Sequence, residues 1–189
     1  AMDDSVKAAL AKWPNVPHCY GWLALDRRGR WLLKGDPLQM PNLEAFIARN
    51  YDGDDHGRWF FQNGPQRVYV ELAYAPWTLR LTAAGTLESH TGEPADRIEG
   101  AWLDDDGNLL LQWQRGLALL DDRDLPTLVD AIRNRDGTPA DHDRLHAFID
   151  GRPADFFLHW RSQVLPLGFI RGHAVPQRFA FVRIPRPET

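Results

Sequence analysis

The sequence contains only one cysteine, three serines and three lysines among its 189 residues. Because Cys19 is alone, the chain cannot form an internal disulfide, which agrees with a reducing compartment. None of the serines lies in a G-x-S-x-G sequence, which argues against a serine hydrolase of the nucleophile-elbow type. The patterns G-x-G-x-x-G and G-x-x-x-x-G-K-[ST] are also missing, so the sequence gives no grounds for a dinucleotide or P-loop site.

Long apolar runs are missing as well. No stretch approaches the roughly 18 apolar residues that a membrane helix needs, and the first residues lack a basic region followed by an apolar one. We therefore expect a cytoplasmic protein with no membrane partner. The net charge is −4 with both signs interspersed, whereas a nucleic-acid-binding protein usually carries a basic face. We expect no nucleic-acid partner.

What the sequence has in abundance is large rings. Eight Trp and nine Phe accompany 43% hydrophobic and 25% charged residues, proportions that are typical of a folded globular protein. Each ring buries a large apolar area. The chain is long enough for one large core or for two small ones.

The segment from Gly21 to Gly35 has two apolar runs around a polar loop with glycine near its end, which predicts a β-hairpin. Further strands are expected at 58–62, 67–73, 77–82, 86–90, 155–161 and 178–184, and helices at 6–13, at 42–50 with Asn42 as cap, and after Thr138. The predicted fold class is therefore α+β, with mainly antiparallel sheets and a few short helices.

A motif in the first half returns in the second. Residues 25–33 and 103–111 both read L-D-x-x-G-x followed by three large apolar residues. A polar stretch at 89–100 separates them, and we expect two similar hairpin–helix–sheet halves packed together, 1–95 and 96–189. The alternative is that two antiparallel hairpins use the same turn chemistry independently.

The block from Val16 to Leu81 contains G-R-W-F-F-Q-N-G-P-Q-R-V-Y-V-E-L at 57–72 and A-P-W at 75–77. With its order of tryptophan hairpin, capped helix and strand, it resembles bacterial domain-of-unknown-function families of small two-part α+β proteins. The resemblance covers about a third of the chain. It implies a fold and brings no reaction, cofactor or catalytic residue.

The pair His142 and His146 stands in H-D-R-L-H, which is similar to the metal-binding H-E-x-x-H pattern. Histidines four apart share one side of a helix. The nearest candidate third ligands are Asp155 and His159. The alternative is two partly exposed histidines at a core edge, since aspartate reaches a metal-bound water less easily than glutamate.

Other chemical signals are weaker. The acidic loops at 52–56 and 104–108 lack the spacing of a calcium loop, and turn formation explains their aspartates. Cys19 and His18 are adjacent in an extended segment and face opposite ways, which favours a buried structural cysteine. We expect no cofactor other than the divalent metal that the histidine pair would hold.

Arginines interleave with tryptophans in R-G-R-W and G-R-W-F-F, a pattern that favours a binding surface for a protein, peptide or small molecule. The alternative is a ring-rich core flanked by arginine stems. The hypothesis is a non-catalytic cytosolic binding protein, with a metal-dependent hydrolase that uses His142 and His146 as the alternative. The expected ligand-binding residues are Arg30, Trp31, Arg58, Trp59 and Trp77.

Overall fold

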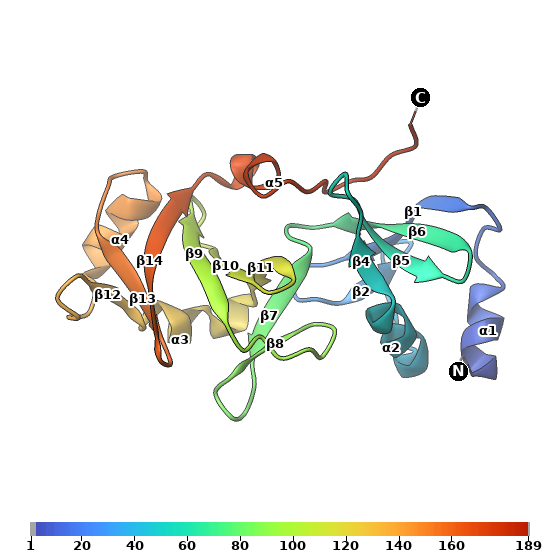
Figure 1. Cartoon of the computed structure of the whole chain (residues 1–189), viewed down its shortest axis with the longest axis horizontal. Helices are drawn as coiled ribbons and strands as arrows, with labels where there is room; N and C mark the ends of the chain where they lie inside the picture. Colours follow the sequence, from blue (N-terminus) through green and yellow to red (C-terminus); the bar gives the residue numbers. More distant parts are fainter. Residues whose placement is uncertain (1–2, 189) are drawn as a thin grey trace. The chain divides into compact units, whose positions relative to one another are not determined.

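The structure, a computed structural model, describes residues 3–188. The chain divides into two compact units. The first unit runs up to Pro76 and also includes His90–Glu93 and the segment from Ala180 onward. The second unit comprises Trp77–Ser89 and Pro94–Phe179. Each unit has its own sheet (Figure 1).

The first unit packs two helices and a six-stranded sheet around a core that includes Leu43, Ile47 and Phe61, each at most 1% exposed. The Phe46 ring of α2 meets Phe61 edge-on at 5.6 Å, so α2 covers this face of the sheet. The elements are α1 (Asp4–Leu10), β1 (His18–Leu25), β2 (Trp31–Leu33), β3 (Asp36–Pro37), α2 (Pro41–Arg49), β4 (Tyr51–Gly53), β5 (Trp59–Asn63) and β6 (Gln66–Leu72).

The second unit has an eight-stranded sheet whose core includes Leu109, Leu110 and Trp113. It begins with the hairpin β7 (Trp77–Leu81) and β8 (Leu87–Ser89). Its other elements are β9 (Ile98–Asp104), β10 (Leu109–Trp113), β11 (Gly116–Leu120), the 3-10 helix η1 (Asp122–Asp124), α3 (Leu125–Val129), β12 (Ile132–Asn134), α4 (His142–Ile149), β13 (Phe156–Trp160), β14 (Gln163–Ile170), the 3-10 helix η2 (Gly172–Ala174) and α5 (Val175–Arg178).

The α+β class is confirmed, and most strand pairs are antiparallel, but both sheets are mixed because each also contains parallel pairing. The hairpin neighbours pair antiparallel, whereas β1 pairs with β6, β14 with β9 and β11 with β7 in parallel. The partners in each parallel pair are far apart in sequence. Local patterns of turns and alternation predict hairpins and carry no information on such distant pairing.

The two sheets share a strand order. The first reads β3-β2-β1-β6-β5-β4, and the second contains β11-β10-β9-β14-β13-β12, with β7 and β8 added beyond β11. The registers also correspond, so that each of the six strands of the first sheet has a counterpart in the second sheet. Corresponding pairs are Leu25–Trp31 and Leu103–Leu109, Leu25–Leu72 and Leu103–Phe169, and Tyr51–Phe61 and Ile132–Leu158.

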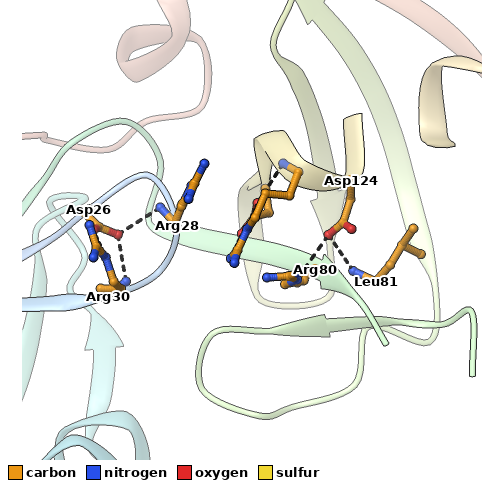
Figure 2. Close-up of polar contacts among 8 residues, drawn as sticks. Asp26, Arg28, Arg30, Arg80, Leu81 and Asp124 are labelled. Atoms are coloured by element: carbon orange, nitrogen blue, oxygen red, sulfur yellow. Dashed lines mark hydrogen bonds and ion pairs between the residues drawn. The ribbon is translucent and has the colours of Figure 1, made fainter. Parts of the chain in front are cut away.

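Five turns of the described chain have one construction, in which a polar residue is followed three positions later by glycine. The polar residue bonds through its backbone N–H to the carbonyl four residues on, and its own carbonyl accepts from the glycine. In Figure 2 the Asp26 carboxylate also accepts from the backbone N–H groups of Arg28 and Arg30. The glycines, Gly29, Gly57, Gly85, Gly107 and Gly137, all have φ between 74° and 85°, a conformation that costs other residues energy.

These turns account for both acidic loops. Asp54 accepts from the backbone of His56 and Arg58, and Asp104 accepts from the backbone of Asp106 and Asn108. The interpretation as turn formers is therefore confirmed for Asp54 and Asp104, whereas the Asp105 carboxylate accepts from the Gly172 backbone N–H instead.

Two helix caps differ from the sequence prediction. Helix α2 begins at Pro41 after Met40, which makes no side-chain cap bond, so Asn42 is not the cap. Helix α4 is capped by the Asp141 carboxylate, which accepts from the backbone of Asp143 at 3.0 Å, and not by Thr138. Thr138 instead closes the turn that begins at Asn134.

The end of the second unit also differs. The expected strand at 155–161 is β13, but 178–184 is not a strand; the closing strand is β14. Pro166 lies where β14 passes from pairing with β13 to pairing with β9, which begins at Leu167. The missing N–H of the proline is therefore not needed by the β9 ladder.

Candidate functional site

The expected ligand-binding residues do not share one surface. Trp31 and Trp77 are core residues, 3% and 4% exposed, and the Trp77 indole donates to the Arg115 carbonyl at 3.0 Å. Arg30 is exposed and its Nε lies 2.6 Å from the Asp26 carboxylate, in the first hairpin turn. A large ring fills a core well, which explains the burial of the two tryptophans.

Arg58 and Trp59 point to opposite faces of the first sheet, as neighbours on a strand do. The Trp59 ring lies 5.2 Å from the Tyr51 ring, on the face that carries Phe61. The Arg58 guanidinium lies over the Tyr69 ring at 5.0 Å. Of the expected residues in the first unit, Arg58 is therefore the one that joins rings on the face away from α2.

A cluster of rings and guanidinium groups lies on that face. Tyr20 and Tyr69 stack at 4.8 Å with an interplanar angle of 16°, and the Arg67 guanidinium lies 3.9 Å from the centre of the Phe60 ring. His18 adds a further ring 6.1 Å from Tyr69. We call this cluster the arginine–tyrosine face; its members are Tyr20, Arg58, Phe60, Arg67 and Tyr69.

Asp54 holds Arg58 in place. Its carboxylate accepts from the Arg58 Nε at 2.8 Å, and Arg67 Nη1 lies 3.8 Å away. Burial alone would raise the pKa of Asp54, but the hydrogen bonds from Arg58 and His56 prevail and lower it, so the carboxylate stays charged. One carboxylate thus orients two guanidinium groups that both lie over rings.

This environment also changes the pKa of Tyr20. Burial is the main cause that raises the pKa of Tyr20, and the neighbouring Tyr69 raises it further. The phenol is therefore neutral near pH 7 and can serve as a hydrogen-bond donor.

The chain itself brings an acidic side chain to this face. The Glu188 carboxylate lies 3.5 Å from Arg58 Nη1 and is 82% exposed. Nearby, the backbone N–H of Val182 donates to the Gly57 carbonyl at 2.8 Å. A carboxylate can therefore reach the Arg58 guanidinium while the latter remains paired with Asp54.

Sequence reasoning found Arg58 and missed Tyr20, Arg67 and Tyr69. The missed signal is the two-residue alternation of the strands, which places His18 with Tyr20 and Arg67 with Tyr69 on one face.

The histidine pair lies in the second unit. His142 and His146 are exposed residues of α4 and line the mouth of a cavity of about 170 Å³. Among residues 3–188, no group of three or more His, Cys, Asp or Glu side chains is placed to hold a metal ion. The proposed third ligand Asp155 instead pairs with Arg135 at 3.4 Å.

Cys19 is buried and free, and its burial raises the pKa of the thiol. A thiol with a raised pKa is a weak nucleophile at neutral pH. Across the described residues, none of the helices is both long enough and apolar enough to cross a membrane.

The comparisons with known proteins concern the family and the fold. No curated protein matches the sequence. A crystal structure of a DUF1285 family protein from Silicibacter pomeroyi DSS-3 shares 16% identity and the fold, with a TM-score of 0.56 over 88% of this chain and 96% of that one. A DUF1285 family protein from Shewanella baltica OS155 shares 17% identity, with a TM-score of 0.44 over 57% of this chain and 89% of that one. Residues 2–186 match the DUF2944 family model, described as "Protein of unknown function (DUF2946)", and the chain therefore belongs to this family, as its resemblance to domain-of-unknown-function proteins led us to expect.

Proposed function

We propose that the protein is a non-catalytic binding protein and that the arginine–tyrosine face holds an acidic segment of a protein partner. The observation that carries the proposal is the pair of guanidinium groups of Arg58 and Arg67, fixed by Asp54 over the rings of Tyr69 and Phe60. A guanidinium group that is already oriented loses little entropy when it binds a carboxylate.

The chemistry of the ligand follows from these groups. Arginine binds carboxylates through two parallel N–H groups. The Phe60 and Tyr69 rings are buried, 7% and 2% exposed, and support the guanidinium groups from below, whereas the Tyr20 ring is half-buried and more open to a ligand. The approach of Glu188 to Arg58 supports a carboxylate ligand. An exposed Glu188 is held weakly, so a partner with several acidic residues can displace it.

The test uses a matched arginine. Arg30 and Arg58 both close a D-x-x-G-R turn and both pair with its aspartate, but only Arg58 belongs to the arginine–tyrosine face, where its guanidinium lies over the Tyr69 ring. We expect a fluorescein-labelled peptide of alternating Glu and Pro to bind the wild-type chain in fluorescence anisotropy. The substitutions Arg58→Ala and Arg67→Ala should weaken binding by about tenfold or more, and Arg30→Ala should leave it unchanged.

Salt and a conservative variant add to the test. Binding should weaken as salt rises, because the charges are partly exposed. Arg58→Lys keeps the charge but lacks the planar fork, so it should rescue binding only in part. The proposal fails if the wild-type chain does not bind the peptide, or if Arg30→Ala weakens binding as much as Arg58→Ala does.

Two further points belong to the proposal. We place the protein in the cytoplasm, in keeping with its single free cysteine. We also propose that its halves, 1–95 and 96–189, descend from one duplicated sheet-and-helix element. Support comes from the shared strand order and from Gln66 and Gln163, which lie at corresponding positions. The Gln66 amide bonds to the backbone just before β1, and the Gln163 amide bonds to the backbone at the start of β9, the counterpart of β1.

A further inference from the structure

The second unit contains a cavity of about 170 Å³ beside α4, at a distance in sequence from every member of the arginine–tyrosine face. Its walls come from the turn after β9, the end of α3, the start of β12 and one side of α4. The lining is mainly apolar, with two imidazoles. It consists of Leu103, Gly107, Val129, Ile132, His142, Leu145, His146 and Ile149.

The cavity depends on an insertion. In the first unit, residues 54–58 form a tight turn between β4 and β5. The corresponding strands of the second unit, β12 and β13, are joined by residues 135–155, which include α4. Half of the lining residues belong to α4, and the others belong to parts that both units have. The added helix thus turns a shared scaffold into the wall of a cavity.

A second difference between the units lies in a strand that both have, β4 in the first unit and β12 in the second. Ile132 corresponds in register to Tyr51 of the first unit. The Tyr51 ring packs against Trp31 at 5.1 Å and Trp59 at 5.2 Å, and its hydroxyl donates to the Pro76 carbonyl. Isoleucine has neither the ring nor the hydroxyl. The first unit fills this position with its own aromatic side chain, and the second unit has an open cavity next to it.

We propose that the cavity binds a small neutral aromatic molecule, about one or two rings in size, that bears one hydrogen-bonding group. A dry apolar cavity of about 150 Å³ is known to accept benzene, so the volume fits a ligand of this class. The ring would lie against Ile132, Leu145 and Ile149. Its polar group would bond to an imidazole of His142 or His146, each of which can donate or accept.

The charges around the cavity favour a neutral ligand. No arginine or lysine lines it. The one arginine on α4, Arg144, lies over the Phe156 ring at 5.1 Å and donates to the Asn134 side chain. The exposed carboxylates of Asp141 and Asp143 stand at the start of α4. An anionic ligand would therefore lack a cationic partner and meet like charges.

The test uses indole and phenol as neutral probes and benzoate as the anionic comparison. Saturation-transfer NMR and isothermal titration with the whole chain should show that indole and phenol bind with dissociation constants of about 1 mM or tighter. Benzoate should bind at least about fivefold more weakly. Equal or tighter binding of benzoate would overturn the neutral-ligand assignment.

Variants locate the binding. Ile132→Tyr installs the residue of the first unit, and Ile149→Phe fills the cavity from α4; each should abolish probe binding. The double substitution His142→Ala and His146→Ala should weaken phenol binding several-fold. His159→Ala is the control, because His159 is in the same unit but does not line the cavity, and it should have no effect.

A folding check keeps the test decisive. Circular dichroism establishes which filled variants retain their structure. If one unfolds, the methyl resonances of Ile132 and Ile149 in the wild-type chain replace it, and both should shift when indole is added. Absence of probe binding by the wild-type chain, or binding that persists in folded Ile132→Tyr and Ile149→Phe variants, would overturn the proposal. Because no peptide is involved, the result is independent of the arginine–tyrosine face.

Discussion

The β4–β5 region of the first unit and the β12–β13 region of the second occupy the same place in the same strand order, but are built differently. The first joins its strands by a tight turn and fills its interior with Tyr51, Trp31 and Trp59. The second joins them by a long segment with a helix and carries Ile132 where the first has Tyr51. The same scaffold therefore accommodates either internal aromatic packing or an inserted helix beside a cavity.

The two regions also present different chemistry. The turn of the first unit carries Asp54 and Arg58, which belong to the charged, ring-lined surface on the outside of the sheet. The insertion of the second unit carries His142 and His146 at the mouth of an apolar cavity. A charged surface suits a macromolecular segment, whereas a small cavity suits a small molecule.

The largest expected loss of stability comes from replacement of Tyr51, the ring that the first unit has and the second unit lacks. Tyr51→Ile should lower the free energy of unfolding by about 3 kcal/mol, because it removes a buried ring and the hydrogen bond to Pro76. Urea denaturation followed by tryptophan fluorescence measures it. Tyr20→Ile, on the open face of the same sheet, should cost about 1 kcal/mol. Equal losses in the two variants would show that the Tyr51 cluster has no special role in the first unit.

Next comes a comparison of two glycines at the same turn position. A Cβ on Gly57 would lie 2.3 Å from the Ala180 carbonyl oxygen, whereas a Cβ on Gly85 would have nothing within 4 Å. Both residues have positive φ. Gly85→Ala should cost about 1 kcal/mol from the backbone alone. Gly57→Ala should cost about 1–2 kcal/mol more, because the segment at Ala180 must move.

The turn aspartates give a third comparison between the units. Asp104 is fully buried, while the side chain of Asp26 is 17% exposed and bonds to an exposed Arg30. Replacement of Asp104 by alanine removes the acceptor of the part-buried N–H groups of Asp106 and Asn108 and empties a fully buried site, and we expect a loss of about 2–3 kcal/mol. Asp26→Ala should cost about 1 kcal/mol because water can replace the carboxylate. Thermal unfolding of both variants measures the difference, and a larger loss for Asp26→Ala would contradict it.

The smallest effect is the dependence of stability on pH. Burial opposes ionisation of Asp54 and Asp121, but hydrogen bonds from Arg58 and Arg123 prevail and lower the pKa of each carboxylate below its unfolded value. Each group therefore stabilises the fold above about pH 4 and loses this contribution as the pH falls through its folded pKa.

Urea midpoints measured from about pH 6 down to about pH 3 should fall, and Asp54→Asn and Asp121→Asn should each flatten the decline. Asp143→Asn, an exposed position, is the control. A decline that neither buried-site variant alters would show that other groups cause it.

Local patterns predicted the parts of the fold that local sequence determines. The L-D-x-x-G-x motif predicted two hairpins, because the hydrogen bonds that close each turn lie within the motif. The residues that make these bonds include Asp26 and Gly29 in the first hairpin and Asp104 and Gly107 in the second. The parallel pairs were not predictable in this way, because they depend on contacts between distant strands. Strand β14 was missed because Pro166 and Gly168 disfavour a strand.

The segment 178–184 was taken for a strand because of its aromatic alternation. Its rings serve other purposes: Phe179 meets the Trp102 ring edge-on at 4.8 Å, and Ala180 adopts a positive φ where the chain passes to the other unit. For the candidate site, the sequence pattern indicated Arg58 but predicted that it shares a surface with tryptophans. Strand alternation, which separates Arg58 from Trp59, required the register that only the structure provides.

The first unit takes its last piece from the far end of the chain. The Leu72 backbone N–H donates to the Arg183 carbonyl at 2.7 Å, and Val182 bonds to Gly57. During synthesis, residues 1–76 leave the ribosome well before this piece is made, so the first unit cannot complete its fold until the whole second unit has been translated. A nonsense mutation after Phe179 would therefore harm the half of the molecule that was translated first.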